Sequence, residues 1–304
     1  MDMAGKRKKK KRRGKRTPAD IVGLIDRISL LVLIVSLAAV YCITAVRMTG
    51  TVYPTKELLD GRAAIRFLDV GQADCTLITH RGHAVLIDAG SAYASSAMAQ
   101  IVSRYAPHID AFFVTHPHED HIGGAPAVLR ASGVEALYLS AAVSHESFYE
   151  DTVRTAERRK TDVVTLSSGG TWTFGDITVE CFDTFGFGYE DLNDASLILR
   201  VSVDGMTLLI AGDAERGLEG YAVDCGFDLH ASILHVNHHG SSSSSTEQWI
   251  DAVSPKIAVI SCGRNNAFGH PSMTVLDRLR SRGIAVLRTD RDGTVVLRGG
   301  EWER

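Results

Sequence analysis

The sequence is poor in cysteine, proline and aromatic residues. Its 304 residues include 5 cysteines and 7 prolines, and aromatic side chains make up 7%. The cysteines form no CxxC pair, so neither a disulfide scaffold nor a cysteine-bound zinc is expected. With 45% hydrophobic residues, the composition also excludes a collagen-like or disordered chain. A mean hydropathy of +0.02 excludes a membrane protein with many spans. What remains is a globular protein with one large domain or two small ones.

Positive charge is concentrated at the N-terminus and scarce elsewhere. Residues 1–20 contain ten lysines and arginines against two aspartates, a net charge of +8. The rest of the chain has 23 basic and 34 acidic residues, a net charge of −11. The net charge of −3 for the whole chain therefore hides a basic tail joined to an acidic body. Such a body repels a polyanion over long range, which argues against nucleic-acid binding unless basic groups gather locally.

One long uncharged run stands out between Arg27 and Arg47. It covers residues 28–46, and as a helix it would span roughly 28 Å, close to the thickness of the bilayer hydrocarbon. We therefore predict a basic cytoplasmic tail over 1–26 and a single transmembrane helix over 27–47. The positive-inside rule then places the body outside the cytoplasm, at the cell membrane. A buried core helix and a cleaved signal peptide are the alternatives. The basic run could also bind nucleic acid, although a topology signal that contacts anionic lipid is the simpler reading.

The body reads as short strands in blocks, with helices between them. We expect a linker over 48–61 and one domain over 62–300, built as two sheets covered by helices. Strands are expected over 63–69, 74–79, 83–88, 111–115, 134–139, 163–166, 177–182, 197–203, 206–211, 232–236, 257–261, 285–288 and 294–297. Helices are expected over 95–105, 121–131, 146–160, 246–253 and 272–282.

The strongest chemical signal is the segment THPHEDHIGG, residues 115–124, which follows the apolar run AFFVT. Three histidines and two carboxylates fall within six residues, and these side chains are the usual ligands of zinc and similar divalent ions. In an extended backbone, His116 and His118 point the same way. Asp120 and His121 begin the next helix and can face a second ion. The sequence therefore predicts a metal site assembled at the end of a strand.

This HxHxDH pattern resembles that of the metallo-β-lactamase superfamily. Further landmarks, in the same order, are similar to the C-terminal hydrolase domain of ComEC-type DNA-uptake (competence) proteins. They are FLDVGQAD at 67–74, VLIDAG at 85–90, NDASL at 193–197, LLIAGDA at 208–214, HHGS at 238–241 and FGHP at 268–271. The resemblance covers about residues 62–300. It does not extend to the many membrane spans of that family's channel, so the chain is expected to be a stand-alone, single-span version of the hydrolase domain.

The resemblance implies a mixed α/β fold, a four-layer αββα sandwich with two divalent ions, Zn²⁺ or Mn²⁺, at the edge between its sheets. It assigns His116 and His118 to the first ion and Asp213 to both. Asp120, His121 and His238 are assigned to the second ion. His238 is preferred over His239, although the sequence leaves that choice open.

One departure from the family pattern concerns the first ion, because many members supply a further histidine before the GD strand. Here that region contains none, and Asn193 and Asp194 are the candidates to take its place, directly or through water. Such a change weakens the first site or favours an oxygen-preferring ion such as Mn²⁺.

The implied reaction is metal-assisted hydrolysis, in which two ions share a hydroxide that Asp120 orients. His270 is a candidate to stabilise the leaving group or contact phosphate, and a histidine packed at a turn is the alternative. We expect Asp74 to orient a ligand histidine from outside the first coordination shell. Ser241, Arg264 and Asn265 are candidate phosphate contacts, with a flexible surface loop as the alternative for the serine.

The resemblance favours a phosphodiesterase or nuclease that acts on extracytoplasmic DNA. The implied partners are the lipid bilayer, through the N-terminal helix, and the DNA-uptake machinery. A hydrolase of a small ester, such as a nucleotide, another phosphodiester or a lactone, is the alternative enzyme. A non-catalytic binding module with a degenerate metal site is the alternative from another class. The sequence does not determine an oligomeric state.

Overall fold

The computed structural model describes residues 61–303, which belong to a compact unit that extends from Pro54 to Arg304. The predicted tail, the predicted transmembrane helix and residues 48–60 of the predicted linker lie outside the described residues. Within 61–303, no helix combines the length and the apolar character needed to cross a bilayer.

The first sheet is built mainly from the N-terminal half of the unit. Its strand order is β15-β14-β1-β2-β3-β4-β5-β6. Strands β3 to β6 pair in parallel, whereas β2, β1, β14 and β15 are added antiparallel at one side. The bounds are β1 Ala64–Phe67, β2 Thr76–His80, β3 His83–Ile87, β4 His108–Val114, β5 Gly133–Leu139, β6 Asp162–Thr165, β14 Val295–Arg298 and β15 Glu301–Glu303.

The second sheet is built from the C-terminal half, in the order β13-β12-β11-β10-β9-β8-β7. Strands β10 to β13 pair in parallel, and β7 to β10 form an antiparallel meander. The bounds are β7 Gly170–Phe174, β8 Ile177–Cys181, β9 Leu199–Val203, β10 Met206–Ile210, β11 Ile233–His235, β12 Ile257–Ile260 and β13 Ala285–Arg288.

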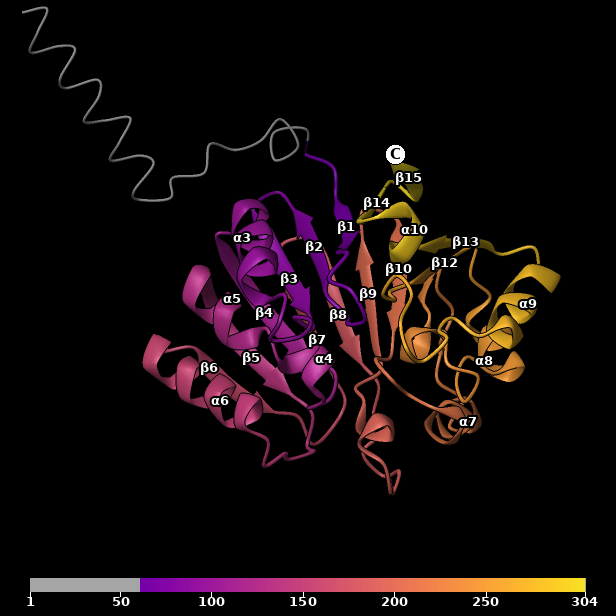
Figure 1. Ribbon diagram of the computed structural model, residues 1–304, viewed down its shortest axis with the longest axis horizontal. Coiled ribbons are helices and arrows are strands. Elements are labelled where there is room, and N and C mark those ends of the chain that lie inside the picture. Colours follow the sequence, from indigo (N-terminus) through magenta and orange to yellow (C-terminus); the bar gives the residue numbers. More distant parts are fainter. Residues whose placement is uncertain (1–60, 304) are drawn as a thin grey trace, which may run out of the picture. The chain divides into compact units, whose positions relative to one another are not determined.

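Three apolar layers hold the sheets and helices together. One lies between the two sheets and includes Ile65, Phe113 and Leu208. Another packs the first sheet against its helices, and a third does the same for the second sheet. Figure 1 shows α3 (Ser95–Tyr105), α4 (Glu119–Ile122), α5 (Ala125–Ala131) and α6 (Ser147–Arg159) on one side, and α7 (Arg216–Asp224), α8 (Glu247–Val253) and α9 (Met273–Ser281) on the other. The mixed α/β sandwich expected from the sequence is therefore confirmed in these residues.

The single helix expected over 121–131 is wrong, because it is two helices, α4 and α5, separated by Gly123 and Gly124. A Cβ atom on Gly124 would collide with the carbonyl oxygen of Ala89. The pair of glycines therefore lets the start of α5 approach the end of β3 closely.

Strand β7 and helix α7 were not expected from the sequence. Strand β7 lies at the edge of its sheet, where only Trp172 and Phe174 pack against the core. Helix α7 contains Gly217 and Gly220, which lower helix propensity, so its formation depends on tertiary contacts.

The parallel strands place their carboxyl ends at one edge of the sandwich. Strands β3 and β4 of the first sheet end there, at Ile87 and Val114, and the parallel strands β10 and β11 of the second sheet end at Ile210 and His235. Loops that follow such strand ends are where α/β proteins gather functional side chains. Each of these four strands is followed within four residues by a histidine or aspartate of the predicted site or its surroundings.

Substitution of Phe113 tests how much the apolar layer between the sheets contributes to stability. Phe113 is fully buried, stacks on Tyr138 with ring centroids 4.5 Å apart, and meets the edge of Trp172 at 5.5 Å. We expect Phe113→Ala to lower the free energy of unfolding by about 3–5 kcal/mol, measured by denaturant titration. Tyr93→Ala, at a fully exposed ring, should change it by no more than about 0.5 kcal/mol. Equal effects of the two changes would contradict this packing.

Candidate metal centre

The loop after β4 is held in place by the buried carboxylate of Asp88. The backbone N–H of Thr115 donates to Asp88 Oδ1 and its hydroxyl donates to Oδ2, both at 2.8 Å. His118 is extended and caps α4, so the chain turns into a helix between His118 and Asp120. One carboxylate at the end of β3 therefore fixes the start of the histidine-rich segment.

His116, His118 and Asp213 form a first cluster. The Nε2 atom of His116 lies 2.9 Å from His118 Nδ1 and 3.9 Å from Asp213 Oδ2. Their ligand atoms all lie within 4.8 Å of one another. Two nitrogens and a carboxylate oxygen thus converge from the loops after β4 and β10, one from each sheet.

A second cluster combines Asp120, His121, Asp213 and His239, again within 4.8 Å. His121 Nε2 lies 3.1 Å from Asp213 Oδ1 and 3.9 Å from Asp120 Oδ1. His239 Nε2 lies 3.2 Å from Asp120 Oδ2 and 3.9 Å from Asp213 Oδ1. Asp213 belongs to both clusters, and its two oxygens face different ones.

The donor set fits divalent metal ions. Within 61–303, His121 Nε2 and Asp213 Oδ1 are buried 3.1 Å from each other and have no other hydrogen-bond partner. Buried polar groups need partners, and a cation bound beside these two atoms would contact both. Imidazole nitrogens with carboxylate oxygens are compatible with zinc, and also with manganese or iron.

Further carboxyl and carbonyl oxygens orient two of the rings in the second cluster. Asp88 Oδ2 accepts from His121 Nδ1 at 2.8 Å, which leaves Nε2 to face the cluster. His239 Nδ1 donates to the carbonyl of Ser261 at 3.0 Å and lies 3.2 Å from Asp74 Oδ1. Such contacts fix the tautomer and orientation of a ligand histidine. Asp74 thus lies behind His239, on the side away from the second cluster.

His235 belongs to this arrangement, and the sequence analysis missed it. It is fully buried at the end of β11, with Nδ1 3.6 Å from Asp74 Oδ2 and Nε2 2.9 Å from the Ser261 hydroxyl. Its ring is parallel to that of Phe67, with centroids 5.6 Å apart. The sequence feature that could have indicated His235 is its place inside the apolar run ILHV, where a polar residue is unusual.

The buried charges shift the pKa values of both partners. Burial raises the pKa of Asp213, but the nearby charges of His121 and His239 outweigh it and hold that pKa well below its ordinary value. For His121 burial lowers the pKa, and the charges of Asp213 and Asp88 outweigh burial and raise it well above the ordinary value. Asp213 therefore remains ionised at neutral pH, and it attracts either protons on the imidazoles or a metal cation.

The sequence favours His238 for the second ion, whereas in the structure it is His239 that joins Asp120, His121 and Asp213 in the second cluster. Both histidines adopt left-handed backbone conformations, with φ of 50° and 52°, in the turn η2 (Asn237–Gly240). His238 faces the other oxygen of Asp213: its Nε2 lies 3.6 Å from Oδ2, the oxygen nearer His116, and its Nδ1 lies 3.2 Å from Glu215 Oε1. Which of the two rings belongs to the second cluster depends on the backbone conformation of this turn.

Asn193 and Asp194, the candidates to replace the missing histidine, lie outside both clusters in this structure. Asp194 Oδ1 accepts the backbone N–H of Glu215 at 2.8 Å, just before α7, and burial raises the pKa of Asp194. Asn193 Nδ2 faces Glu215 Oε1 at 3.5 Å. Neither belongs to a cluster. Instead, the hydroxyl of Ser196 accepts the backbone N–H of Asp213 at 3.2 Å and supports that ligand from behind.

Three of the remaining candidates gather in one cleft. His270, Arg264 and Asn265 line it together with Arg288 and Arg291, and its volume is about 610 Å³. The ring of His270 meets the edge of the His238 ring, with centroids 5.8 Å apart, and its Nδ1 is buried without a partner among the described residues. Burial and the charge of His238 lower the pKa of His270, which keeps it neutral at pH 7.

Ser241 lies in a loop that is anchored rather than free. Its hydroxyl pairs with that of Ser243 at 2.8 Å. The buried carboxylate of Glu219 accepts the backbone N–H groups of Ser245 and Thr246. Glu219 is a further residue that sequence reasoning missed, because a glutamate on a helix with two glycines has no distinctive pattern. The flexible-loop alternative is therefore not what the structure shows.

The choice between the two adjacent histidines can be tested by metal binding. We expect His239→Asn to remove one bound divalent ion per chain, because the second cluster loses one of its four members. His238→Asn, its matched neighbour, should retain the wild-type metal content. Elemental analysis after dialysis against Zn²⁺ or Mn²⁺ measures both. The opposite pattern would restore His238 as the ligand.

Asp88 offers a second test, because it touches His121 and Thr115 but belongs to neither metal cluster with Asp213. Asp88→Asn should lower metal affinity by about 10–100-fold, as expected when a partner behind a ligand histidine is lost. Asp69→Asn, at an exposed carboxylate, is the matched control and should leave the affinity unchanged. Calorimetric titration with Zn²⁺ gives both values. Wild-type affinity in a folded Asp88→Asn chain would show that this carboxylate does not position His121.

Comparison with known proteins agrees with the resemblance found in the sequence. ComE operon protein 3 of Bacillus subtilis is 28% identical over 81% of this chain and 34% of that protein. Competence protein ComA of Neisseria gonorrhoeae is 30% identical over 82% of this chain and 34% of that protein. The chain thus spans about a third of the length of these two relatives. Its similarity to ComEC-type competence proteins is confirmed.

Two other comparisons concern proteins of similar size. Exodeoxyribonuclease WalJ of Streptococcus pneumoniae is 24% identical over 66% of this chain and 82% of that protein. The crystal structure of the metallo-beta-lactamase fold protein YhfI from Bacillus subtilis aligns with a TM-score of 0.53 and 12% identity, over 78% of this chain and 99% of that chain. At that identity the alignment shows the fold alone.

The model of the family described as the metallo-beta-lactamase superfamily matches residues 68–264, which is more than half of the chain. The matched region contains both clusters and most of the two sheets. The chain therefore belongs to the metallo-beta-lactamase superfamily.

Proposed function

We propose that this protein is a metal-dependent phosphodiesterase, a nuclease that acts on extracytoplasmic DNA. The observation that carries the proposal is the pair of clusters that share Asp213 at the edge between the sheets. Two divalent ions held by one carboxylate can stabilise both the attacking and the leaving oxygen of a phosphate.

The ligand assignment we propose follows the distances. His116 and His118 would hold the first ion, Asp120, His121 and His239 would hold the second, and Asp213 is placed to serve both. When bound, Zn²⁺ or Mn²⁺ lowers the pKa of a water molecule towards neutrality and offsets the negative charge of the phosphate.

The chain's own residues supply orientation and proton control. Asp120 lies at the partly exposed rim of the second cluster. Burial raises the pKa of Asp120, but the charge of His121 and the hydrogen bond from His239 outweigh burial, so the net pKa is lowered. Asp120 is therefore ionised at neutral pH and able to accept a hydrogen bond from the attacking water. His270 is neutral and stands beside His238 at the entrance of the arginine-lined cleft. A neutral imidazole in that place can donate a hydrogen bond to the leaving oxygen.

The arginine-lined cleft addresses the charge problem posed by the acidic body. Arg264, Arg288 and Arg291 gather there, with Asp290 as the acidic residue of the lining. Arg288 forms a salt bridge with Asp290 at 2.7 Å, and the two charges offset each other. Arg264 and Arg291 then give the lining of the cleft a net positive charge. Local positive charge of this kind supports contact with the phosphate backbone, even though the body as a whole is negative.

The names of two relatives support DNA as the substrate. ComA is by name a competence protein and WalJ an exodeoxyribonuclease, and this chain is similar to both. We propose that residues 27–47 anchor the protein in the cell membrane, with residues 1–26 in the cytoplasm and the domain outside. DNA and the lipid bilayer are then its partners, and the DNA-uptake machinery is a further one.

Incubation with single- and double-stranded DNA in Mn²⁺ or Zn²⁺ tests the proposal. We expect metal-dependent degradation that EDTA abolishes and that His118→Ala lowers by at least about 100-fold, more than loss of an outer residue would. His230→Ala, at an exposed histidine outside both clusters, should keep wild-type activity. Intact DNA with turnover of a small phosphodiester would reassign the protein to small esters. Bound metal with no turnover of any ester would indicate a binding module.

A further inference from the structure

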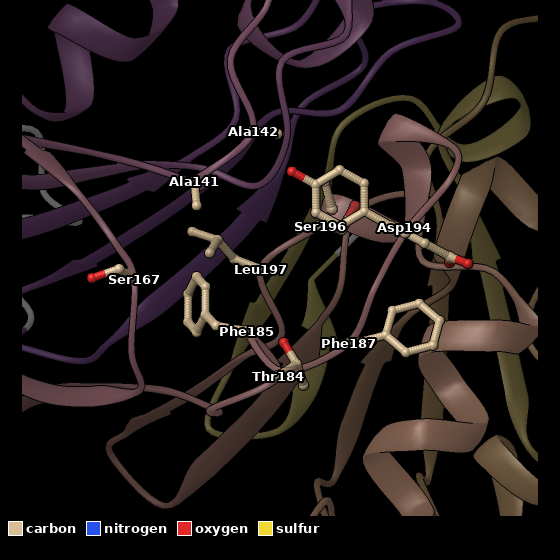
Figure 2. A pocket seen from close by; sticks show the side chains of 11 residues that line it. Ala141, Ala142, Ser167, Thr184, Phe185, Phe187, Asp194, Ser196 and Leu197 are labelled. Atoms are coloured by element: carbon tan, nitrogen blue, oxygen red, sulfur yellow. The ribbon is translucent and has the colours of Figure 1, made fainter.

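A small apolar pocket lies beside the metal centre, and none of the roles above uses it (Figure 2). It has a volume of about 190 Å³. Phe185, Phe187, Tyr189 and Leu197 provide most of its apolar wall. Pockets that bury a drug-sized ligand typically measure roughly 300–1,000 Å³, so this one suits a single ring system.

Two hydrogen bonds connect the wall of the pocket to the metal centre. The N–H of Leu197 donates to the carbonyl of Thr115 at 2.9 Å, and Thr115 directly precedes His116. The hydroxyl of Ser196, also in the wall, accepts the N–H of Asp213 at 3.2 Å. The pocket is therefore adjacent to the segments that carry both clusters.

The chemistry of the wall favours a flat, uncharged group. In Figure 2 the rings of Phe185 and Phe187 lie on either side of Thr184. The wall contains no lysine or arginine, and Asp194, its one charged residue, has an oxygen that accepts the Glu215 N–H. A phosphate would find no cation here, whereas an aromatic ligand would find rings to stack on.

We propose that this pocket binds the nucleobase of the nucleotide next to the phosphate that is cleaved. The inference rests on the proposed nuclease function and adds a base-binding subsite to it. The metal centre and the arginine-lined cleft then receive phosphates, and the pocket receives the neutral base. Stacking on aromatic rings tolerates every base, so the subsite selects for the presence of a base rather than for sequence.

Substitution of Tyr189 can distinguish a role of the pocket in base binding from a role in packing. The side chain of Tyr189 is 42% exposed, so its removal does not open the core. Phe185 packs against the layer between the sheets, and Phe187 contacts the ring of Tyr221 with centroids 5.3 Å apart, so both contribute to packing as well. Tyr189→Ala is therefore the test variant, and Tyr189→Phe, which keeps the ring, is its matched partner.

The experiment uses the full-length chain with Mn²⁺ and two oligonucleotides of equal length, one with all its bases and one abasic. We expect the wild type to cleave the base-bearing strand with a kcat/KM at least about fivefold higher, mainly through KM. Tyr189→Ala should bring this ratio close to one, and Tyr189→Phe should keep it. Tyr93→Ala, at an exposed tyrosine outside the pocket, should keep it as well.

Binding to the same two strands, measured by fluorescence anisotropy in a His118→Ala background, separates this inference from the proposed function. Tighter binding of the base-bearing strand, lost in Tyr189→Ala and kept in Tyr189→Phe, supports the subsite even if no DNA is cleaved. Equal affinity for the two strands, or no measurable binding of either, overturns it. Equal kcat/KM values in the wild type also overturn it and leave the nuclease function standing.

Discussion

Three carboxylates, those of Asp74, Asp88 and Asp213, are buried together at one edge of the sandwich, and the site depends on how their charge is balanced. Removing an ionised carboxylate from water costs several kcal/mol unless positive charge and hydrogen bonds replace the lost hydration. Here His121 and His239 lie between these carboxylates, which explains why the pKa values of both imidazoles rise despite burial. The same balance explains why the edge suits divalent cations.

The close approach of the two sheets at this edge depends on small residues and on shared backbone contacts. Gly212 has a φ of +50°, and a Cβ atom there would collide with Thr115 and press on the hydroxyl of Ser196. The glycine before Asp213 thus lets the end of β10 meet the loop after β4, so that one aspartate reaches both clusters. Ser196 supports Asp213 and also lines the apolar pocket, so the metal centre and the pocket form one connected region.

Local patterns predicted well where a single strand or helix carries its own signal. The helix over 95–105 is observed with the same bounds, and the strand expected over 83–88 is observed as β3, His83–Ile87. Prediction failed where stability comes from elsewhere in the chain. Helix α7 is anchored through Asp194, some 20 residues away, and through the burial of Leu218 and Ala222. The edge strand β15 exists because it pairs with β14.

By itself, the sequence determined the kind of chemistry and its place in the chain. A dense group of histidines and carboxylates after an apolar strand limits the ligands to imidazole and carboxylate, since ligand type follows from residue type. Only the tertiary structure decided which of two adjacent histidines joins Asp120 and His121 in the second cluster, because that depends on left-handed backbone angles in one turn. It also decided that Asn193 and Asp194 face Glu215, that His235 stands behind Asp74, and that aromatic side chains from one loop form a pocket. These outcomes depend on contacts between residues far apart in the chain, and a linear pattern does not contain such distances.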